Sequence, residues 1–352
     1  MRYLALASLT LMSSVACGSS PSEAAADASA ALDATARDAD SDSAGPDSGS
    51  ERRQAGQPDA GPDTTGSPRI GPCPVFPADS PWNTDVSAAA VHVDSDRFID
   101  SIGREKHLHP DFGTIWDGAP IGIPFALVDA SQPAVPIVFT AYGDESDPGP
   151  YPVPTDAPIE GGASSDGDRH VLVVDTAACR LYELYRAFPR SDGSWEAASG
   201  AVFDLARNDH HPFSWTSADA AGLPIFPGLA RYEEVAQQGE VRHALRFTVS
   251  RSRRAVVAPA RHYASSNDDP ALPPMGLRLR MKASYDCGAY SSLAQVLCRG
   301  LKRYGMIVAD NGSDWYISGA PDGRWDDDAL GDLKRVPGDA FEVVHTGPIE
   351  TY

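Results

Sequence analysis

The pattern of hydrophobic and polar positions changes near residue 70. Residues 18–70 consist almost wholly of Ala, Asp, Ser, Gly and Pro, and Leu32 is their only large aliphatic side chain before Ile70. Such a segment buries too little apolar surface to offset the entropy lost on ordering. We therefore expect a disordered acidic tether over 17–70 and a single folded domain over 71–352, which is long enough for one large core.

In the folded region, apolar stretches rich in β-branched and aromatic residues alternate with clusters of Gly, Pro, Asp and Ser. This spacing is typical of strands joined by turns. The predicted strands are 135–142, 170–175, 181–188, 242–250, 254–260, 277–283, 315–318 and 340–345. The pattern predicts a mostly β fold, a single antiparallel β-sandwich of the jelly-roll type.

Two segments have helical spacing instead. Over 291–304 the apolar residues recur every three or four positions, Ser291 and Ser292 precede them, and Gly305 follows. These are the usual signals for the start and end of a helix. A second, shorter helix is predicted over 95–102, and both should lie at the periphery of the sandwich.

The first 16 residues resemble a signal peptide, because Arg2 precedes an apolar run too short to span a bilayer. Residues Ser14-Val15-Ala16-Cys17 resemble the lipobox of bacterial lipoproteins, although that motif usually has Leu where Ser14 stands. The resemblance implies acylation of Cys17 and an exported lipoprotein, anchored by lipid at the outer membrane or cell surface. Ordinary signal cleavage nearby is the alternative.

The charge balance excludes some partners. The chain has 29 Lys and Arg against 49 Asp and Glu, a formal net charge of −20. Nucleic acid rewards clustered cations, so we expect no nucleic-acid partner. One segment reverses the balance, because Arg278, Arg280 and Lys282 alternate with apolar residues and share a strand face. This stripe suits an anionic polysaccharide, or it is a solvated face paired with acids.

Four cysteines follow Cys17, namely Cys73, Cys179, Cys287 and Cys298. An even number supports export to an oxidising compartment, and it allows three pairings. Cys287 and Cys298 would be about 16 Å apart in one continuous helix, beyond the reach of a disulfide. That pairing therefore requires a bend between them.

The familiar nucleotide-binding, zincin, serine-esterase and EF-hand motifs are absent from the sequence. His107, His109 and Asp111 alternate like the metal ligands of a strand, but no Glu follows at the cupin spacing. Four acidic clusters read as solvated turns that could each bind Ca²⁺: 144–147, 166–168, 310–314 and 326–328. We expect no required cofactor, with structural Ca²⁺ or another divalent metal as the open alternative.

The predicted strands 170–175 and 181–188 are separated by a short turn and form a hairpin. If facing residues sum to 355, His170 lies opposite Tyr185, and Glu183 lies opposite Leu172. His170, Glu183 and Tyr185 then share an apolar face, where a carboxyl group needs a partner.

A second hairpin is predicted around the polar turn 251–253. If the turn is centred on Ser252 and Arg253, His243 lies opposite His262. A shift by one residue would place the two rings on opposite faces. If both hairpins contribute to one concave sheet, the three histidines and Glu183 converge.

Convergent His and Glu side chains allow two chemistries. They can act as acid, base and positioning group, because apolar surroundings raise the pKa of a carboxyl. They can instead hold a divalent metal. The third possibility is that each histidine only satisfies a local hydrogen bond.

The tryptophans lie mostly in predicted loops beside acids or amides, a setting that suits stacking on sugar rings. Trp116 and Trp215 are the candidates for substrate binding, with Tyr185 and the stripe Arg278, Arg280 and Lys282; core anchoring is the alternative for each tryptophan. Glycoside hydrolysis needs two carboxyls beside one bond. Asp219 and Asp204 are the candidates to pair with Glu183.

The region from Cys73 to about Val344 also resembles a group of secreted bacterial proteins of unknown function. The resemblance rests on His109-Pro110-Asp111-Phe112-Gly113 and on segments 215–223 and 304–312. It implies one exported domain and transfers no catalytic residue.

Together these patterns predict an envelope-anchored carbohydrate-active enzyme, a glycoside hydrolase or polysaccharide lyase that acts on an extracellular polysaccharide. Its catalytic candidates are Glu183, His170, His243, His262 and Asp219. The alternatives are a non-catalytic glycan-binding surface lipoprotein and a metal-dependent hydrolase.

Overall fold

A computed structural model describes residues 66–352, all of which belong to one compact unit. The predicted signal peptide, the lipidation site Cys17 and most of the tether lie outside the described residues. The last residues of the predicted tether do not, because β1 (Arg69–Ile70) pairs with β2 (Cys73–Pro74). Regular structure therefore begins just before residue 71.

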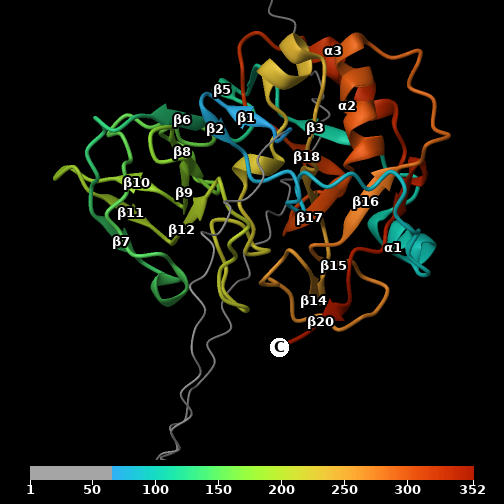
Figure 1. Ribbon diagram of the computed structural model, residues 1–352, viewed down its shortest axis with the longest axis horizontal. Coiled ribbons are helices and arrows are strands. Elements are labelled where there is room, and N and C mark those ends of the chain that lie inside the picture. The colour runs from blue at the N-terminus through green and yellow to red at the C-terminus, as the bar shows by residue number, and fades with distance from the viewer. Residues whose placement is uncertain (1–65) are drawn as a thin grey trace, which may run out of the picture. The chain divides into compact units, whose positions relative to one another are not determined.

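The largest sheet has six strands. Their order is β19 (Phe341–Val343), β16 (Arg278–Met281), β17 (Met306–Asn311), β13 (Leu245–Val249), β18 (Tyr316–Ser318) and β3 (His109–Asp111). Figure 1 shows this sheet in teal, orange and red, with α1 and α2 beside it. A three-stranded sheet of β15 (Pro274–Met275), β14 (Arg253–Val257) and β20 (Ile349–Glu350) lies below it in that view.

A second group of strands, green in Figure 1, comes from the first half of the described chain. Its four-stranded sheet has the order β12 (Ser199–Asp204), β9 (Arg180–Tyr185), β8 (Val171–Asp175) and β6 (Phe125–Val128). A three-stranded sheet accompanies it, with the order β10 (Phe188–Pro189), β11 (Trp195–Ala197) and β7 (Ile137–Phe139). The hairpin of β4 (Ile115–Trp116) and β5 (Ala119–Pro120) stands apart from both.

Alternation along the strands of the four-stranded sheet divides its side chains between two cores. Leu172, Val174 and Leu181 belong to the larger core, which is shared with the six-stranded sheet. Val173 and Leu184 point the other way, into a smaller core shared with β11. Because side chains of a strand alternate between faces, one sheet serves both cores.

Helices are few and short. They are α1 (Ser95–Ile102), α2 (Ser292–Arg303), α3 (Asp327–Gly331), the π-helix η3 (Glu233–Gln238) and the 3-10 turns η1 (Gly143–Glu145), η2 (Phe226–Gly228), η4 (Asp332–Arg335) and η5 (Gly338–Ala340). The hydroxyl of Ser291 caps α2 by accepting a hydrogen bond from the N–H of Ala294 at 3.3 Å. Both predicted helices are confirmed, α1 at its predicted bounds and α2 within one residue at each end.

The mostly β prediction is confirmed, but the purely antiparallel pairing is wrong. Parallel pairs join β13 to β17, β18 to β3, β6 to β8, β11 to β7 and β14 to β15. The described residues form several small mixed sheets and show no single closed sandwich. The long connections between strands allow these parallel pairs, which a short turn cannot make.

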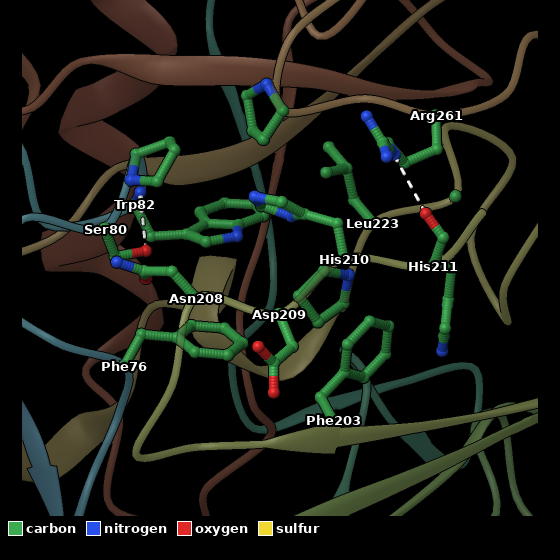
Figure 2. Close-up of a pocket in the computed structure, with 14 residues that line it drawn as sticks. Phe76, Ser80, Trp82, Phe203, Asn208, Asp209, His210, His211, Leu223 and Arg261 are labelled. Carbon is green, nitrogen blue, oxygen red and sulfur yellow. Dashed lines mark hydrogen bonds between the residues drawn. The ribbon is translucent and has the colours of Figure 1, made fainter. Parts of the chain in front are cut away.

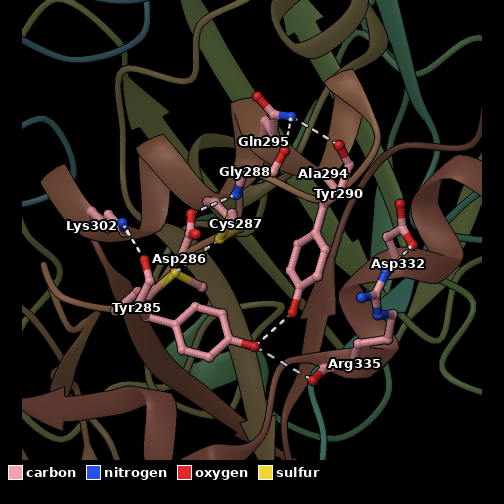
Figure 3. Close-up of a disulfide and its surroundings, with 12 residues drawn as sticks. Tyr285, Asp286, Cys287, Gly288, Tyr290, Ala294, Gln295, Lys302, Asp332 and Arg335 are labelled. Atoms are coloured by element: carbon pink, nitrogen blue, oxygen red, sulfur yellow. Dashed lines mark hydrogen bonds and ion pairs between the residues drawn. A yellow bond between two sulfur atoms is a disulfide. The ribbon is translucent and has the colours of Figure 1, made fainter.

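Two disulfides are present, Cys73–Cys179 and Cys287–Cys298, with Cα atoms 5.3 and 6.6 Å apart. The second pair is possible because α2 starts at Ser292, so Cys287 lies in the turn before the helix (Figure 3). This is the bend that the spacing of the two cysteines requires. The disulfides are consistent with an extracytoplasmic protein.

Candidate functional site

Four adjacent strands of the six-stranded sheet carry polar side chains on one face. Asp111 on β3 pairs with Ser318 on β18. Arg246 on β13 donates to the hydroxyl of Ser318 at 2.8 Å, so both point to this face. Asp310 on β17 lies at a register shift, where it faces Thr248. A bulge re-aims a side chain, which is a frequent device beside active sites.

The guanidinium of Arg246 organises this face. It makes two hydrogen bonds to the carboxylate of Asp219, at 2.8 and 2.9 Å, and one to Asp310 at 2.9 Å. Asp219 is fully buried, and the Arg246 side chain is only 5% exposed. A charge-assisted, two-bond contact of this kind fixes both groups. We call Arg246, Asp219, Asp310 and Ser318, together with the nearby Asp111, Glu160 and His170, the Arg246 cluster.

His170 reaches the cluster from the residue just before β8. Its Nδ1 lies 2.6 Å from Glu160 and its Nε2 lies 3.0 Å from the carbonyl of Ala218. Burial lowers the pKa of His170, but the charge and hydrogen bond of Glu160 outweigh it and raise that pKa to about 9. At neutral pH the ring is therefore an imidazolium that donates to both partners, so it is a fixed cation and a poor base.

The carboxyls of the cluster differ in acidity. Burial, followed by repulsion from Asp219, raises the pKa of Asp310 to about 7, although 22% of the side chain stays accessible. Burial opposes ionisation of Glu160, but the charge of His170 lowers its pKa overall. Asp111 is solvent-accessible, and partial burial and the charge of Glu160 raise its pKa. Carboxyls of unequal pKa beside fixed cations are the arrangement used for acid–base chemistry.

Glu183 is buried near the cluster, where the charges of Asp219 and His170 act on its pKa. Its two oxygens accept hydrogen bonds of 2.9–3.0 Å from the N–H groups of Ile225 and Phe226 at the start of η2. Burial raises the pKa of Glu183 to about 7, against the effect of these bonds. The side chain has no exposed surface, so it positions the 225–228 segment.

The β8–β9 hairpin has the predicted register. Leu172 faces Glu183 and Val171 faces Leu184, so facing residues sum to 355. The rings of His170 and Tyr185 are 5.6 Å apart. Tyr185 is half-buried, and burial and the charge of Asp168 raise its pKa. The hairpin therefore delivers His170, Glu183 and Tyr185 to one face, as predicted.

The predicted pairing of His243 with His262 is wrong. β13 pairs with β17 and β18, while β14 pairs with β15 and β20, so no hairpin joins β13 to β14. The turn 251–253 links two different sheets.

The two histidines have different surroundings. His243 is fully buried with Glu234 (3.1 Å) and the carbonyl of Ala244 (2.8 Å). Arg231 completes that group through its contact with Glu234, and we call Arg231, Glu234 and His243 the Glu234 triad. His262 instead donates from its Nδ1 to the carbonyl of Ala220 at 2.7 Å, and Ala220 follows the cluster residue Asp219 in the chain. In the neutral ring this leaves a lone pair on Nε2.

The tryptophans fall into two groups by solvent exposure. Trp116 is 74% exposed on the β4–β5 hairpin, and Trp215 is half-buried. The other four, Trp82, Trp195, Trp315 and Trp325, are buried in the core. Beside the hairpin of Trp116 is an apolar groove of about 580 Å³ whose wall includes Ile115, Ile159 and Gly161. Glu160 lies between two of these wall residues in the chain, so the loop that lines the groove also supplies Glu160 to the Arg246 cluster.

The three cations of the basic stripe, Arg278, Arg280 and Lys282, make hydrogen bonds within the fold. Arg278 is buried and donates to backbone carbonyls of Pro81, Thr84 and Tyr304. Arg280 pairs with Glu342 at 2.8 Å and donates to three carbonyls in the segment 86–89. Lys282 donates to the carbonyl of Asp339 at 2.7 Å. These bonds fasten the segment 81–89 to the sheet.

Five residues of the cluster were not among the catalytic candidates: Arg246, Asp310, Glu160, Asp111 and Ser318. Arg246 stands inside the apolar strand 244–249, and Asp310 ends the apolar run 306–309. A charged residue in a run of buried positions requires a partner, and this was the available signal. Glu160 lies in a long loop and carried no such signal.

In the described range 66–352, no group of three or more His, Cys, Asp and Glu side chains is arranged to hold a metal ion. None of the helices in this range is long and apolar enough to cross a membrane. Comparison of the chain with protein-family models, curated proteins and solved structures finds no match. The site must therefore be interpreted from its own geometry.

Proposed function

We propose that this protein is an exported glycoside hydrolase that acts on an extracellular polysaccharide, with the Arg246 cluster as its active site. The observation that carries the proposal is the pair of accessible carboxyls, Asp310 on β17 and Asp111 on β3, with the cation Arg246 on β13 between these two strands. Glycosidases use one protonated and one ionised carboxyl in this way.

Asp310 is the general acid. Its raised pKa keeps a useful fraction protonated near neutral pH, where it can donate to the leaving oxygen of the glycosidic bond. Asp111 is the general base for water, and Glu160 holds His170 as a fixed cation. Asp219 and Glu183 act through other groups, because Asp219 positions Arg246 and Glu183 positions η2.

The substrate is held by groups at the rim of the site. Trp116 offers an exposed ring for stacking, and Tyr185 lies beside His170. The lone pair on Nε2 of His262 can accept a hydrogen bond from a sugar hydroxyl. Trp215 is half-buried, with its ring 6.3 Å from His211, and is a weaker candidate for stacking.

Two features favour hydrolysis over elimination. A lyase needs a strong base and a free cation to neutralise the uronate carboxyl. The raised pKa of Tyr185 disfavours the phenolate, and Arg246 is already saturated by Asp219 and Asp310. The stripe Arg278, Arg280 and Lys282 is engaged with the backbone.

The strand order also suggests the stereochemistry. β3 and β17 are separated by β18 and β13, so the backbones of Asp111 and Asp310 are about 14 Å apart at ~4.8 Å for each strand spacing. The carboxyls of retaining enzymes lie only ~5 Å apart, whereas inverting enzymes leave room for water between them. The backbone separation argues against a retaining pair, and inversion requires the two carboxyls to approach to roughly 6.5–9.5 Å around the substrate.

The test is an assay of the full chain on a panel of neutral and acidic polysaccharides. We expect release of reducing ends, and a loss of at least about 10³-fold in kcat for Asp310→Asn and Asp111→Asn. Asp100→Asn, at an exposed position on α1, is the matched control. Proton NMR of the first product identifies the anomer. Unsaturated products would overturn hydrolysis, and wild-type kcat in both site variants would remove the proposed site.

The same panel distinguishes a second function, because the exposed Trp116 also suits a non-catalytic glycan-binding protein. That function predicts binding without turnover and loss of binding in Trp116→Ala. The lipobox-like sequence and the two disulfides support anchoring of the protein outside the cytoplasm. Cells that express the full chain, with and without Cys17→Ala, can be labelled with palmitate. Incorporation of the label that depends on Cys17 tests the anchor.

A further inference from the structure

A second concave site lies at the free edge of the four-stranded sheet, beside β12. It is a groove of about 420 Å³ with three aromatic residues in its wall, Tyr151, Tyr182 and Phe203. Polar residues complete it, namely Asp147, Asp204, Asp209, Arg180, His210 and His211. We call it the His211 groove. It shares none of these residues with the Arg246 cluster.

The strand register explains this separation. Val202 on β12 faces Tyr182 on β9, and Asp204 faces Arg180. These four positions alternate with Glu183 and Phe203, so they lie on the sheet face opposite Glu183 and Tyr185. Phe203 lines the groove from the other face because β12 is the edge strand.

His211 lines this groove, and one of its ring nitrogens has no hydrogen-bond partner in the range 66–352. Its Nε2 donates to Asp147 at 2.8 Å, and the same oxygen of Asp147 accepts the N–H of Val202 at 2.7 Å. The Nδ1 atom of His211 is buried without a partner among the described residues. In the neutral ring this nitrogen is an acceptor, and a buried acceptor left unpaired costs about 1–3 kcal/mol.

The other side of His211 is nearly closed. Figure 2 shows Trp82, Phe203, Asn208, His210 and His211 around a small cavity. Its volume of about 20 Å³ is enough for one water molecule and too small for a ligand. The small cavity therefore cannot hold a sugar, and the larger groove is the only one of the two with room for one.

We propose that the His211 groove binds one or two residues of a neutral polysaccharide, at a site separate from the catalytic cluster. The ring of Tyr182 supplies the apolar platform, while the carboxylate of Asp204 accepts hydrogen bonds from sugar hydroxyls and Arg180 donates hydrogen bonds to them. Acidic residues outnumber the one arginine, so uncharged sugars fit better than uronates. The choice of a polysaccharide rests on the proposed function, but the recognition chemistry does not require turnover.

The binding test uses the full chain carrying Asp310→Asn, titrated by calorimetry with cellohexaose, xylohexaose, mannohexaose, maltohexaose and laminarihexaose. We expect at least one hexasaccharide to bind, and Tyr182→Ala or Asp204→Asn to weaken that binding at least about 10-fold. The matched control is Phe188→Ala, which removes an exposed aromatic ring on β10. Thermal unfolding checks that each variant is folded.

A second readout needs no substitution in the groove, so it does not depend on whether the groove variants fold. Proton–nitrogen NMR of the histidine rings should show a shift of the His211 ring resonances when the hexasaccharide is added, because His211 lines the groove. Absence of binding by every hexasaccharide overturns the proposal, and so does equal binding by the Tyr182→Ala variant. Failure of the catalytic proposal looks different, because it abolishes turnover on the polysaccharide panel and leaves this titration unchanged.

Discussion

The Arg246 cluster and the Glu234 triad are both buried groups of ion pairs, and both are attached to the start of β13. In the Glu234 triad one carboxylate is shared between Arg231 and His243, and all three side chains are at most 7% exposed. In the Arg246 cluster the carboxyls outnumber the cations, and Asp111, Glu160 and Asp310 reach solvent. In the triad every charged side chain has a buried partner. The cluster keeps excess negative charge and accessible carboxyls that are available to a ligand.

The pKa values show the same contrast. Arg231 and His243 overcome the burial of Glu234 and lower its pKa to about 2. In the cluster the pKa of Asp310 moves the opposite way, because burial and Asp219 outweigh Arg246. A buried ion pair whose charges are all partnered serves the structure. A carboxyl whose pKa is shifted in an accessible site is a candidate for function. The four predictions below test this difference, from the largest expected effect to the smallest.

The strongest test is Glu234→Gln in the triad. Removing this charge leaves Arg231 and His243 buried without their anion, so we expect a loss of about 3–5 kcal/mol in the free energy of unfolding. Urea unfolding at pH 7 measures it. Turnover by the folded fraction should stay at the wild-type value. A variant that is stable but inactive would mean that the triad serves catalysis.

The next test concerns His170. Its pKa rises from 6.5 in the unfolded chain to about 9 in the fold, so its contribution is complete below pH 6.5 and is lost as the pH rises through 9. We expect a decrease of roughly 3 kcal/mol in the free energy of unfolding over this window. In His170→Gln the decrease should disappear. An unchanged alkaline decrease in the variant would place the titrating group elsewhere.

Glu183 should have a pH effect in a lower window. Its pKa rises from 4.5 to about 7, so the folded form binds more protons and loses stability as the pH rises between these values. We expect Glu183→Gln to remove roughly 2–3 kcal/mol of this pH-dependent loss in the free energy of unfolding. The titration of Asp310 accounts for the rest of the loss. Chemical unfolding from pH 4.5 to 7.5 measures both. A slope identical to that of the wild type would contradict the assignment.

The smallest effect is expected outside both groups, at Lys282. Its ammonium donates one exposed hydrogen bond to the carbonyl of Asp339, so Lys282→Ala should cost less than about 1 kcal/mol. Turnover of neutral and acidic polysaccharides should be unchanged. A selective loss with the acidic polymer would restore the basic strand as a substrate-binding surface.

Local features of this fold could be predicted from the sequence, and distant ones could not. The β8–β9 register followed from a four-residue turn, and α2 from its serine cap and apolar period. The register of β13 failed because its partners, β17 and β18, lie some 60 residues further along the chain. The site shows the same limit. His170, Glu183 and Tyr185 came together through one hairpin, but Arg246 and Asp310 meet through the long-range parallel pairing of β13 and β17, and Asp219 reaches them from a loop.

The disulfide Cys73–Cys179 gives the fold a particular mechanical attachment. A pull on the chain before residue 66 first reaches the small pair of β1 and β2, which would peel easily by itself. The covalent bond at Cys73 passes the load instead to the turn between β8 and β9, at the edge of the larger core. The bond therefore couples the first strands of the described chain covalently to the sheet that carries Glu183 and Tyr185.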